Sequence, residues 1–226
     1  MYKYELHAHT SECDLAARLG GGDLVRLYKE AGYDGIVITD HYFELFFRWF
    51  REELEGLPHT LQMRRWQKGY LTAKAEGGKL GFTVLPGAEV RFNSCPNDYL
   101  LYGLPEDFFS AAPRLNELES LRDLALLLPE QTCVVQAHPF RDGMVMQSPE
   151  SLFGIEVFNG GTGSFRNELA CRFAEHYSLA KTSGSDIHGI DALAKGGILT
   201  DRRIRTPEDL STVLRSGDYA LIEPSL

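Results

Sequence analysis

Five of the seven histidines lie in short segments that also carry carboxylates, and imidazole with carboxylate is a donor set that binds divalent metals. They are His7, His9, His41, His138 and His188. His7 and His9 are two residues apart, so in an extended segment both imidazoles point to the same side. An isolated pair of this kind is as compatible with two half-buried histidines on a strand as with a bidentate metal clamp.

Carboxylates recur in the same pattern. Asp186 and His188 form a second pair two residues apart, and Asp40 precedes His41, where it suits either a helix cap or a partner of a metal ligand. Glu89 lies in the apolar context PGAEV, and a lone buried glutamate is costly unless it is paired. Each feature alone has an ordinary structural explanation. Together they predict a metal site that suits zinc, manganese or iron, among which the donor types do not choose.

The elements that must position these side chains alternate between strands and helices. Apolar runs predict strands at 2–6, 35–39, 82–85, 99–102, 133–136, 155–158 and 181–184, and a short one near 221. Helical patterns occupy 23–31, 61–75, 115–128, 169–176 and 207–215, with Asp23 as a candidate N-cap. This alternation predicts a parallel sheet with helices outside and sites at the strand C-termini. A barrel fits better than an open sheet, because candidate ligands follow nearly every strand.

Length, charge and cysteine usage limit the function classes. A chain of 226 residues with 43% hydrophobic content suits one domain spanning 1–226. The formal charge of -9 argues against a nucleic-acid surface built from clustered lysine and arginine. The four cysteines form no CxxC pair, the N-terminus lacks a signal-like apolar segment, and no run reaches the roughly 18 apolar residues of a membrane span. We therefore expect a soluble, cytoplasmic protein with reduced thiols and no membrane partner.

Seven ordered segments resemble the polymerase-and-histidinol-phosphatase (PHP) family of metal-dependent phosphoesterases. They are HAHTSECD, GYDGIVITDH, VLPGAEV, NDYLLYGL, AHPF, IEVFNGG and SGSDIHG. The resemblance spans nearly the whole chain, and seven motifs in order are far more specific than any one of them. It implies an α/β fold of the distorted (β/α)7 TIM-like barrel type, as a single domain, with metals at the strand C-termini.

The resemblance also implies a set of ligands for two or three divalent ions (Zn, Mn or Fe). A first ion would be held by His7, His9, Glu89 and Asp186, and a second by Glu89, His138 and Asp98. A third would use Asp14, His41 and His188. Asp98 stands where many members have histidine, which makes the second site harder and favours manganese or iron over zinc. Asp14 stands where some relatives have histidine, so the third site is expected to bind more weakly or to fill only with substrate.

The activity implied by the resemblance is hydrolysis of phosphate esters, as a phosphatase or phosphodiesterase, on a small phosphorylated metabolite. A hydroxide bridging two ions about 3.5 to 4 Å apart would attack phosphorus in line. If unligated, Asp14 or His188 would protonate the leaving oxygen. Arg141, Arg91 and Asn159 are candidates for substrate binding, although the arginines equally suit a solvated surface and the asparagine a turn.

Other functions stay open. Histidinol-phosphate or phosphotyrosine hydrolysis would use the same ligands, whereas a polymerase-editing exonuclease is disfavoured because the chain has no polymerase region or basic groove. A non-catalytic, metal-stabilised binding or regulatory module is expected to have lost several ligands. Residues 42–70 interleave aromatic side chains with arginines, and we expect an amphipathic helical cover with a packed aromatic face rather than a nucleobase-stacking surface. The sequence does not indicate an oligomeric state.

Overall fold

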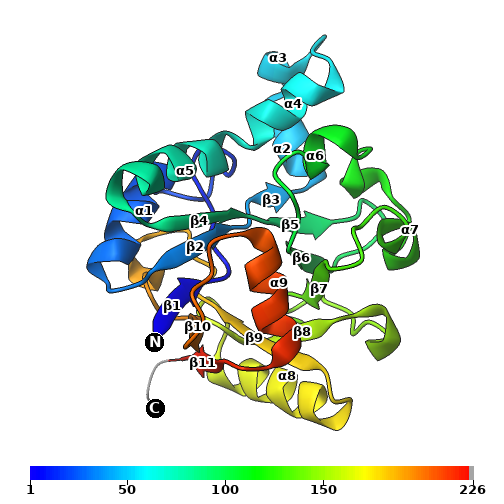
Figure 1. Ribbon diagram of the computed structural model, residues 1–226. Coiled ribbons are helices and arrows are strands. Elements are labelled where there is room, and N and C mark those ends of the chain that lie inside the picture. Colours follow the sequence, from blue (N-terminus) through cyan, green and yellow to red (C-terminus); the bar gives the residue numbers. More distant parts are fainter. Residues whose placement is uncertain (224–226) are drawn as a thin grey trace.

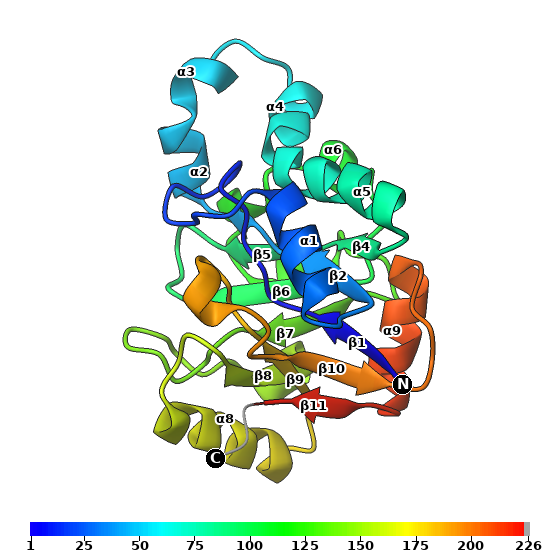
Figure 2. The same cartoon turned by 90° about the vertical axis from the view of Figure 1, so that its left-hand side faces the viewer.

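The computed structural model describes residues 1–223 and arranges their strands in two mixed sheets (Figures 1 and 2). The first sheet has the order β11-β10-β1-β2-β4, with β1 (Tyr2–Glu5), β2 (Gly35–Ile38), β4 (Thr83–Pro86), β10 (Gly197–Thr200) and β11 (Ala220–Ile222). The second has the order β3-β5-β6-β7-β8-β9, with β3 (His41–Tyr42), β5 (Ala88–Arg91), β6 (Asp98–Tyr102), β7 (Cys133–Gln136), β8 (Gly154–Asn159) and β9 (Ala180–Gly184). The α/β class is confirmed.

A closed barrel is not confirmed, because the strand pairs of residues 1–223 leave two open sheets. The chain passes from the first sheet to the second at Gly87, which separates β4 from β5. The backbone passes so close to β2 there that a Cβ on residue 87 would lie 2.8 Å from Cγ1 of Val37. Glycine is needed at this close approach.

The expectation of an all-parallel sheet is wrong. β1 pairs with β2 in parallel, and β7 with β8 and β8 with β9 do so as well, but β6 runs antiparallel to both β5 and β7. β10, which the sequence pattern did not predict, runs antiparallel to β1 and β11. The reversal of β6 matters for the site. Its first residue, Asp98, pairs with Arg91 at the end of β5, so Asp98 lies at the same edge as residues that follow parallel strands.

Nine helices occur in the described chain: α1 (Gly21–Glu30), α2 (Glu44–Trp49), α3 (Arg51–Leu54), α4 (His59–Trp66), α5 (Lys68–Leu80), α6 (Phe108–Ala111), α7 (Leu121–Ala125), α8 (Ser164–His176) and α9 (Pro207–Ser216). Gly20, not Asp23, is the N-cap of α1, and Asp23 lies in the first turn, where its charge suits the helix dipole. The helix predicted over 61–75 is divided into α4 and α5 at Gln67. The one predicted over 115–128 shrinks to a 3-10 turn and α7, which begins at a Ser120 cap.

The aromatic segment after β3 forms the predicted helical cover. α2, α3 and α4 project together from one end of the molecule, while α8 lies at the opposite end (Figures 1 and 2). Phe46, Met63 and Trp66 are buried in one apolar cluster with strands β5 and β6, so the aromatic face is packed against the fold. No helix within residues 1–223 is long and apolar enough to cross a membrane.

Candidate metal centre

All nine residues expected to bind metal come together at one place in the fold. They form four overlapping groups, in each of which one donor atom per residue lies within 4.8 Å of the others. The groups are His9, Asp14, His41 and His188; His7, His9 and Glu89; His7, His138 and Asp186; and Glu89, Asp98 and His138. Eight of the nine lie within a strand or no more than four residues beyond one, whereas Asp14 lies in the loop between β1 and α1.

Glu89 is the hub of the arrangement. Its side chain is 1% exposed, and the register of β3 with β5 places it opposite His41. Oε2 of Glu89 lies 2.9 Å from Nε2 of His41, 3.4 Å from Nε2 of His9 and 3.5 Å from Nε2 of His7. Oε1 lies 2.9 Å from Nε2 of His138. One carboxylate thus contacts residues of all four groups, as a bridging ligand must.

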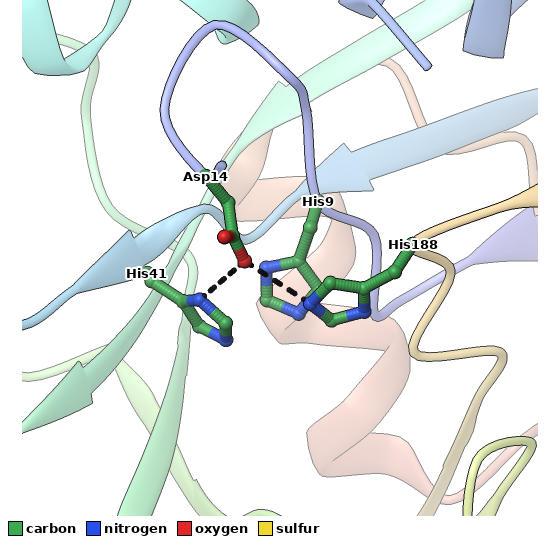
Figure 3. A group of neighbouring side chains, drawn as sticks. All are labelled: His9, Asp14, His41 and His188. Atoms are coloured by element: carbon green, nitrogen blue, oxygen red, sulfur yellow. Dashed lines mark hydrogen bonds and ion pairs between the residues drawn. The ribbon is translucent and has the colours of Figure 1, made fainter. Parts of the chain in front are cut away.

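The group around His9 is drawn in Figure 3, where the side chains of His41, Asp14 and His188 surround His9. Oδ2 of Asp14 lies 2.7 Å from Nδ1 of His41 and 3.1 Å from Nε2 of His188. The ring of His9 lies 4.1 Å from that of His41 and 4.4 Å from that of His188, measured between centroids. The loop between β1 and α1 brings Asp14 here by turning at Thr10, whose carbonyl accepts the Asp14 N–H.

Buried nitrogen atoms without hydrogen bonds show that the residues present fit a metal. Nδ1 and Nε2 of His9, Nε2 of His7 and Nδ1 of His138 are all inaccessible and have no hydrogen-bond partner. Such atoms are rare in folded proteins, since each costs the hydration that it has lost. Burial, and next the charge of His41, lower the pKa of His9 to about 3, so this ring is neutral and keeps a free lone pair. Nitrogen and carboxylate donors without cysteine suit zinc, manganese and iron.

Protons on histidine rings offset part of the negative charge of the carboxylates in the cluster. Burial alone would lower the pKa of His41, but its hydrogen bonds with Asp14 and Glu89 raise it to about 10. Burial would raise the pKa of Asp14, yet hydrogen bonds with His188 and His41 hold it well below its usual range. Asp14 is therefore ionised, and the protonated ring of His41 balances its charge. Divalent cations at this centre would take over that balancing role.

Both candidate arginines contact carboxylates of the cluster instead of lying free on the surface. Nε and Nη2 of Arg91 donate to the two carboxylate oxygens of Asp98 at 2.6 and 2.7 Å. Nη2 of Arg141 donates to Oδ2 of Asp186 at 2.6 Å and to Oδ1 of Asn159 at 3.1 Å. About a third of each arginine side chain stays exposed, so both line the edge of the centre.

Two buried carboxylates behind the ligands escaped the sequence analysis. Glu156 contacts Nδ1 of His7 at 2.7 Å, and Glu5 accepts hydrogen bonds from the backbone N–H groups of His7 and Ser185. The signal that drew attention to Glu89, a charged residue in an apolar strand, is present at both. Asp40 also lies behind the ligands: it accepts hydrogen bonds from N and Oγ1 of Thr10, and burial raises its pKa to about 7.

Backbone strain marks two of the ligand positions. His138 has a φ of 28° and Asp186 a φ of 51°, in the left-handed region that non-glycine residues seldom adopt. Strain of this kind persists where surrounding contacts hold it, and it concentrates at functional sites. Here it turns each side chain inward immediately after a strand, β7 for His138 and β9 for Asp186.

Comparison with known proteins finds one family model and several solved structures that are similar to this chain. Residues 165–219 match the family model described as PHP-associated. No curated protein matches the chain. Among solved structures, PsfC from Pseudomonas syringae is similar at 15% identity and a TM-score of 0.67, covering 99% of this chain and 92% of its own.

Two further structures extend the comparison. A two-domain protein from Bacteroides vulgatus, containing a predicted PHP-like metal-dependent phosphoesterase, is similar at 16% identity and a TM-score of 0.65; the match covers 98% of this chain but only 64% of that protein. An amidohydrolase from Chromobacterium violaceum with bound sulfate and no metal is similar at 15% identity and a TM-score of 0.57, covering 82% of this chain and 87% of its own. The resemblance seen in the sequence motifs is confirmed.

Proposed function

We propose that this chain is a PHP-type metal-dependent hydrolase that cleaves phosphate esters of a small phosphorylated metabolite, on the basis of its ordered motifs and the match of residues 165–219 to a PHP-associated model. The observation that carries the proposal is the convergence of eight imidazole and carboxylate side chains around Glu89, with buried histidine nitrogens that lack any other partner. A structural role alone does not account for so many ionisable groups at one point, because burying each of them is costly.

The candidate ligands can be divided among two or three ions, of which the first two share Glu89. We assign the first ion to His7, His9, Glu89 and Asp186, the second to Glu89, His138 and Asp98, and the third to Asp14, His41 and His188. Bound divalent ions would polarise phosphoryl oxygens and lower the pKa of a coordinated water. They would also supply the positive charge that a chain of net charge -9 otherwise lacks.

Arg141 is suited to hold the substrate phosphate. Its contacts with Asp186, Asn159 and Thr162 all use Nη2, which leaves Nε and Nη1 available for a phosphate oxygen. A free guanidinium N–H donates a charge-assisted hydrogen bond to a phosphate oxygen. Asn159 orients Arg141 through its Oδ1 and contacts Asp186 through its Nδ2, so it serves the same subsite. Arg91 takes a corresponding place beside Asp98.

His188 is suited to supply a proton to the leaving oxygen when it carries no ion. It is 31% exposed, the most open of the candidate ligands, and Asp14 contacts its Nε2. Burial lowers the pKa of His188, but the hydrogen bond with Asp14 and the charge of Asp186 outweigh it and raise the pKa. The raised pKa favours the protonated ring that a general acid needs.

We also interpret the two sheets as parts of one distorted (β/α)7 barrel. An isolated parallel bridge between Ala8 and Ile187 joins the extension of β1 to the extension of β9, and these strands belong to different sheets. A Cβ on Gly196, just before β10, would lie 2.3 Å from the carbonyl carbon of Gly184 in β9. This close contact supports a nearly continuous wall around the centre.

Turnover of p-nitrophenyl phosphate tests the proposed reaction. The protein is stripped with chelator, reloaded with manganese, zinc or iron, and assayed beside bis(p-nitrophenyl) phosphate and p-nitroacetanilide, which report phosphodiester and amide cleavage. We expect metal-dependent phosphate release that fails in His9→Ala and persists in His176→Ala, a matched control at an exposed position of α8. Amide cleavage without phosphoester cleavage would overturn the phosphoesterase proposal. A screen of phosphorylated metabolites then identifies the substrate.

A further inference from the structure

Glu156 is a buried carboxylate that lies among the candidate ligands without belonging to any ligand group. Its side chain is 1% exposed, and its three contacts are all with hydrogen-bond donors. Oε1 lies 2.7 Å from Nδ1 of His7, and Oε2 accepts from the backbone N–H of His138 and from Nδ2 of Asn159, each at 2.9 Å. Asn159 in turn contacts Asp186 at 3.2 Å. One carboxylate is thereby linked to three of the candidate ligands.

The fold makes specific provision for the pair of Glu156 and His7. The register between β8 and β9 shifts between Glu156 and Phe158, an irregularity of the kind that re-aims side chains near functional sites. Gly184 in β9 leaves the space in which the two side chains meet. A Cβ on residue 184 would lie 2.3 Å from Cβ of His7 and 2.8 Å from Oε1 of Glu156, closer than atoms can approach.

We infer that Glu156 is a positioning residue of the metal centre, which fixes the ring of His7 and the backbone of His138 so that both imidazoles meet an ion. The inference rests on the proposed function only in requiring that ions bind. By accepting the Nδ1–H of His7, Glu156 sets the tautomer that leaves Nε2 with a free lone pair. Nε2 of His7 has no hydrogen-bond partner and lies 3.5 Å from both Oε2 of Glu89 and Oδ1 of Asp186, beside the expected ion.

A carboxylate is required at this position because donors surround both of its oxygens. Glutamine has one oxygen and one NH2 group in the same plane. In Glu156→Gln, the NH2 would face either Nδ1–H of His7 or the N–H groups of His138 and Asn159. In both cases two hydrogen-bond donors would face each other and no hydrogen bond could form. One side of the network must therefore break. Loss of a partner behind a metal-ligating histidine typically weakens metal binding by roughly 10- to 100-fold.

The dissociation constant for zinc tests the inference without any measurement of turnover. Three proteins are compared: the parent, Glu156→Gln, and the control Glu168→Gln at an exposed position on α8. Each is titrated with zinc against a chromophoric chelator to obtain its affinity. Each is also unfolded with urea in EDTA to obtain its metal-free stability. We expect Glu156→Gln to bind zinc roughly 10- to 100-fold more weakly while the control binds like the parent. Equal affinity of Glu156→Gln and the parent would overturn the inference.

A second measurement on the unmodified protein serves even if the variant does not fold. A long-range proton–nitrogen spectrum of the zinc-loaded protein should show the His7 ring protonated at Nδ1, exchanging slowly, with zinc at Nε2. In the zinc-loaded protein, a His7 ring that is protonated at Nε2, or that has no proton at Nδ1, would overturn the inference. A parent that binds zinc with these signatures but cleaves no phosphoester refutes the proposed function and leaves the role of Glu156 standing.

Discussion

Two histidines of the metal centre carry an extra proton when no ion is bound. For this reason the stability of the folded protein and its affinity for metal depend on pH in opposite directions. Hydrogen bonds with Asp14 and Glu89 overcome the effect of burial and raise the pKa of His41 from 6.5 to about 10. Burial also lowers the pKa of His7, but the charges of Glu156 and Asp186 outweigh it and place that pKa well above 6.5. Both rings therefore carry a proton at pH 7 when no ion is bound.

The expected magnitude follows from linkage between proton binding and folding. A pKa that rises from 6.5 in the unfolded chain to about 10 in the folded protein stabilises the fold by up to about 5 kcal/mol, at about 1.4 kcal/mol per pH unit. This contribution of His41 is complete below pH 6.5 and is lost as the pH rises through about 10. Metal binding has the opposite dependence, because each ring must release its proton first; affinity rises up to about tenfold per pH unit for each displaced proton.

Titration calorimetry measures the effect directly. Zinc or manganese is added at pH 7 in buffers that differ in ionisation enthalpy, which counts the protons released, and urea unfolding in EDTA is followed from pH 6.5 to 10. We expect at least two protons released on loading, fewer in His41→Asn, and a metal-free stability that falls over this range. Metal binding without proton release, or a metal-free stability that rises from pH 6.5 to 10, would refute the reasoning.

Three further outcomes follow from the packing and charge of the site. Arg141→Ala should raise KM for a phosphate ester by about 10- to 100-fold in steady-state assays, since a hydrogen bond to a charged group is worth about 1.5 to 3 kcal/mol. Leu100→Ala, in the core of β6, should lower the free energy of unfolding by about 2 to 5 kcal/mol, and Leu126→Ala, at an 81% exposed position, by less than about 0.5 kcal/mol; urea titration that shows equal losses would contradict this. Gly69→Ala places a Cβ 1.8 Å from Oγ1 of Thr10, so the loop that carries Asp14 must shift, with an expected loss of about 1 to 3 kcal/mol by urea unfolding.

The convergence of the site residues could be predicted because its signal is local. Each candidate ligand is an imidazole or carboxylate beside an apolar run, and the ends of such runs meet at one edge in an α/β fold. His7, Glu89 and Asp186 illustrate this, since they are far apart in sequence and meet in the structure within 3.5 Å. Their order in the chain supplied the family resemblance.

Strand direction could not be predicted from the same patterns. The apolar residues of β6 read alike in either direction, so the sequence did not reveal that this strand runs antiparallel or that Asp98 therefore begins it at the site edge. β10 escaped for a related reason, since Gly197–Thr200 is too short to show a clear period. Helix α7 was overestimated because three consecutive leucines, two of them at least 37% exposed, suggested a longer apolar face.

The positioning carboxylates escaped because their meaning depends on tertiary contacts. Glu5 and Glu156 lie within strands rather than beyond them, and nothing beside them in sequence indicates that the backbone of His7 or the N–H of His138 is their partner. A charged residue in an apolar strand is therefore a signal in its own right. Applied uniformly, it would have found Glu5 and Glu156 together with Glu89.

Metal-dependent phosphate release by the purified chain tests the central claim most directly. The protein is stripped with chelator, its metal content is determined by elemental analysis before and after reloading, and hydrolysis of p-nitrophenyl phosphate is followed in each state. The expected result is hydrolysis that disappears with the metal, returns when two or three ions per chain are restored, and is absent from Asp186→Ala. Hydrolysis that is unchanged by chelation or by Asp186→Ala, or a reloaded protein that releases no phosphate from any ester, would contradict the account.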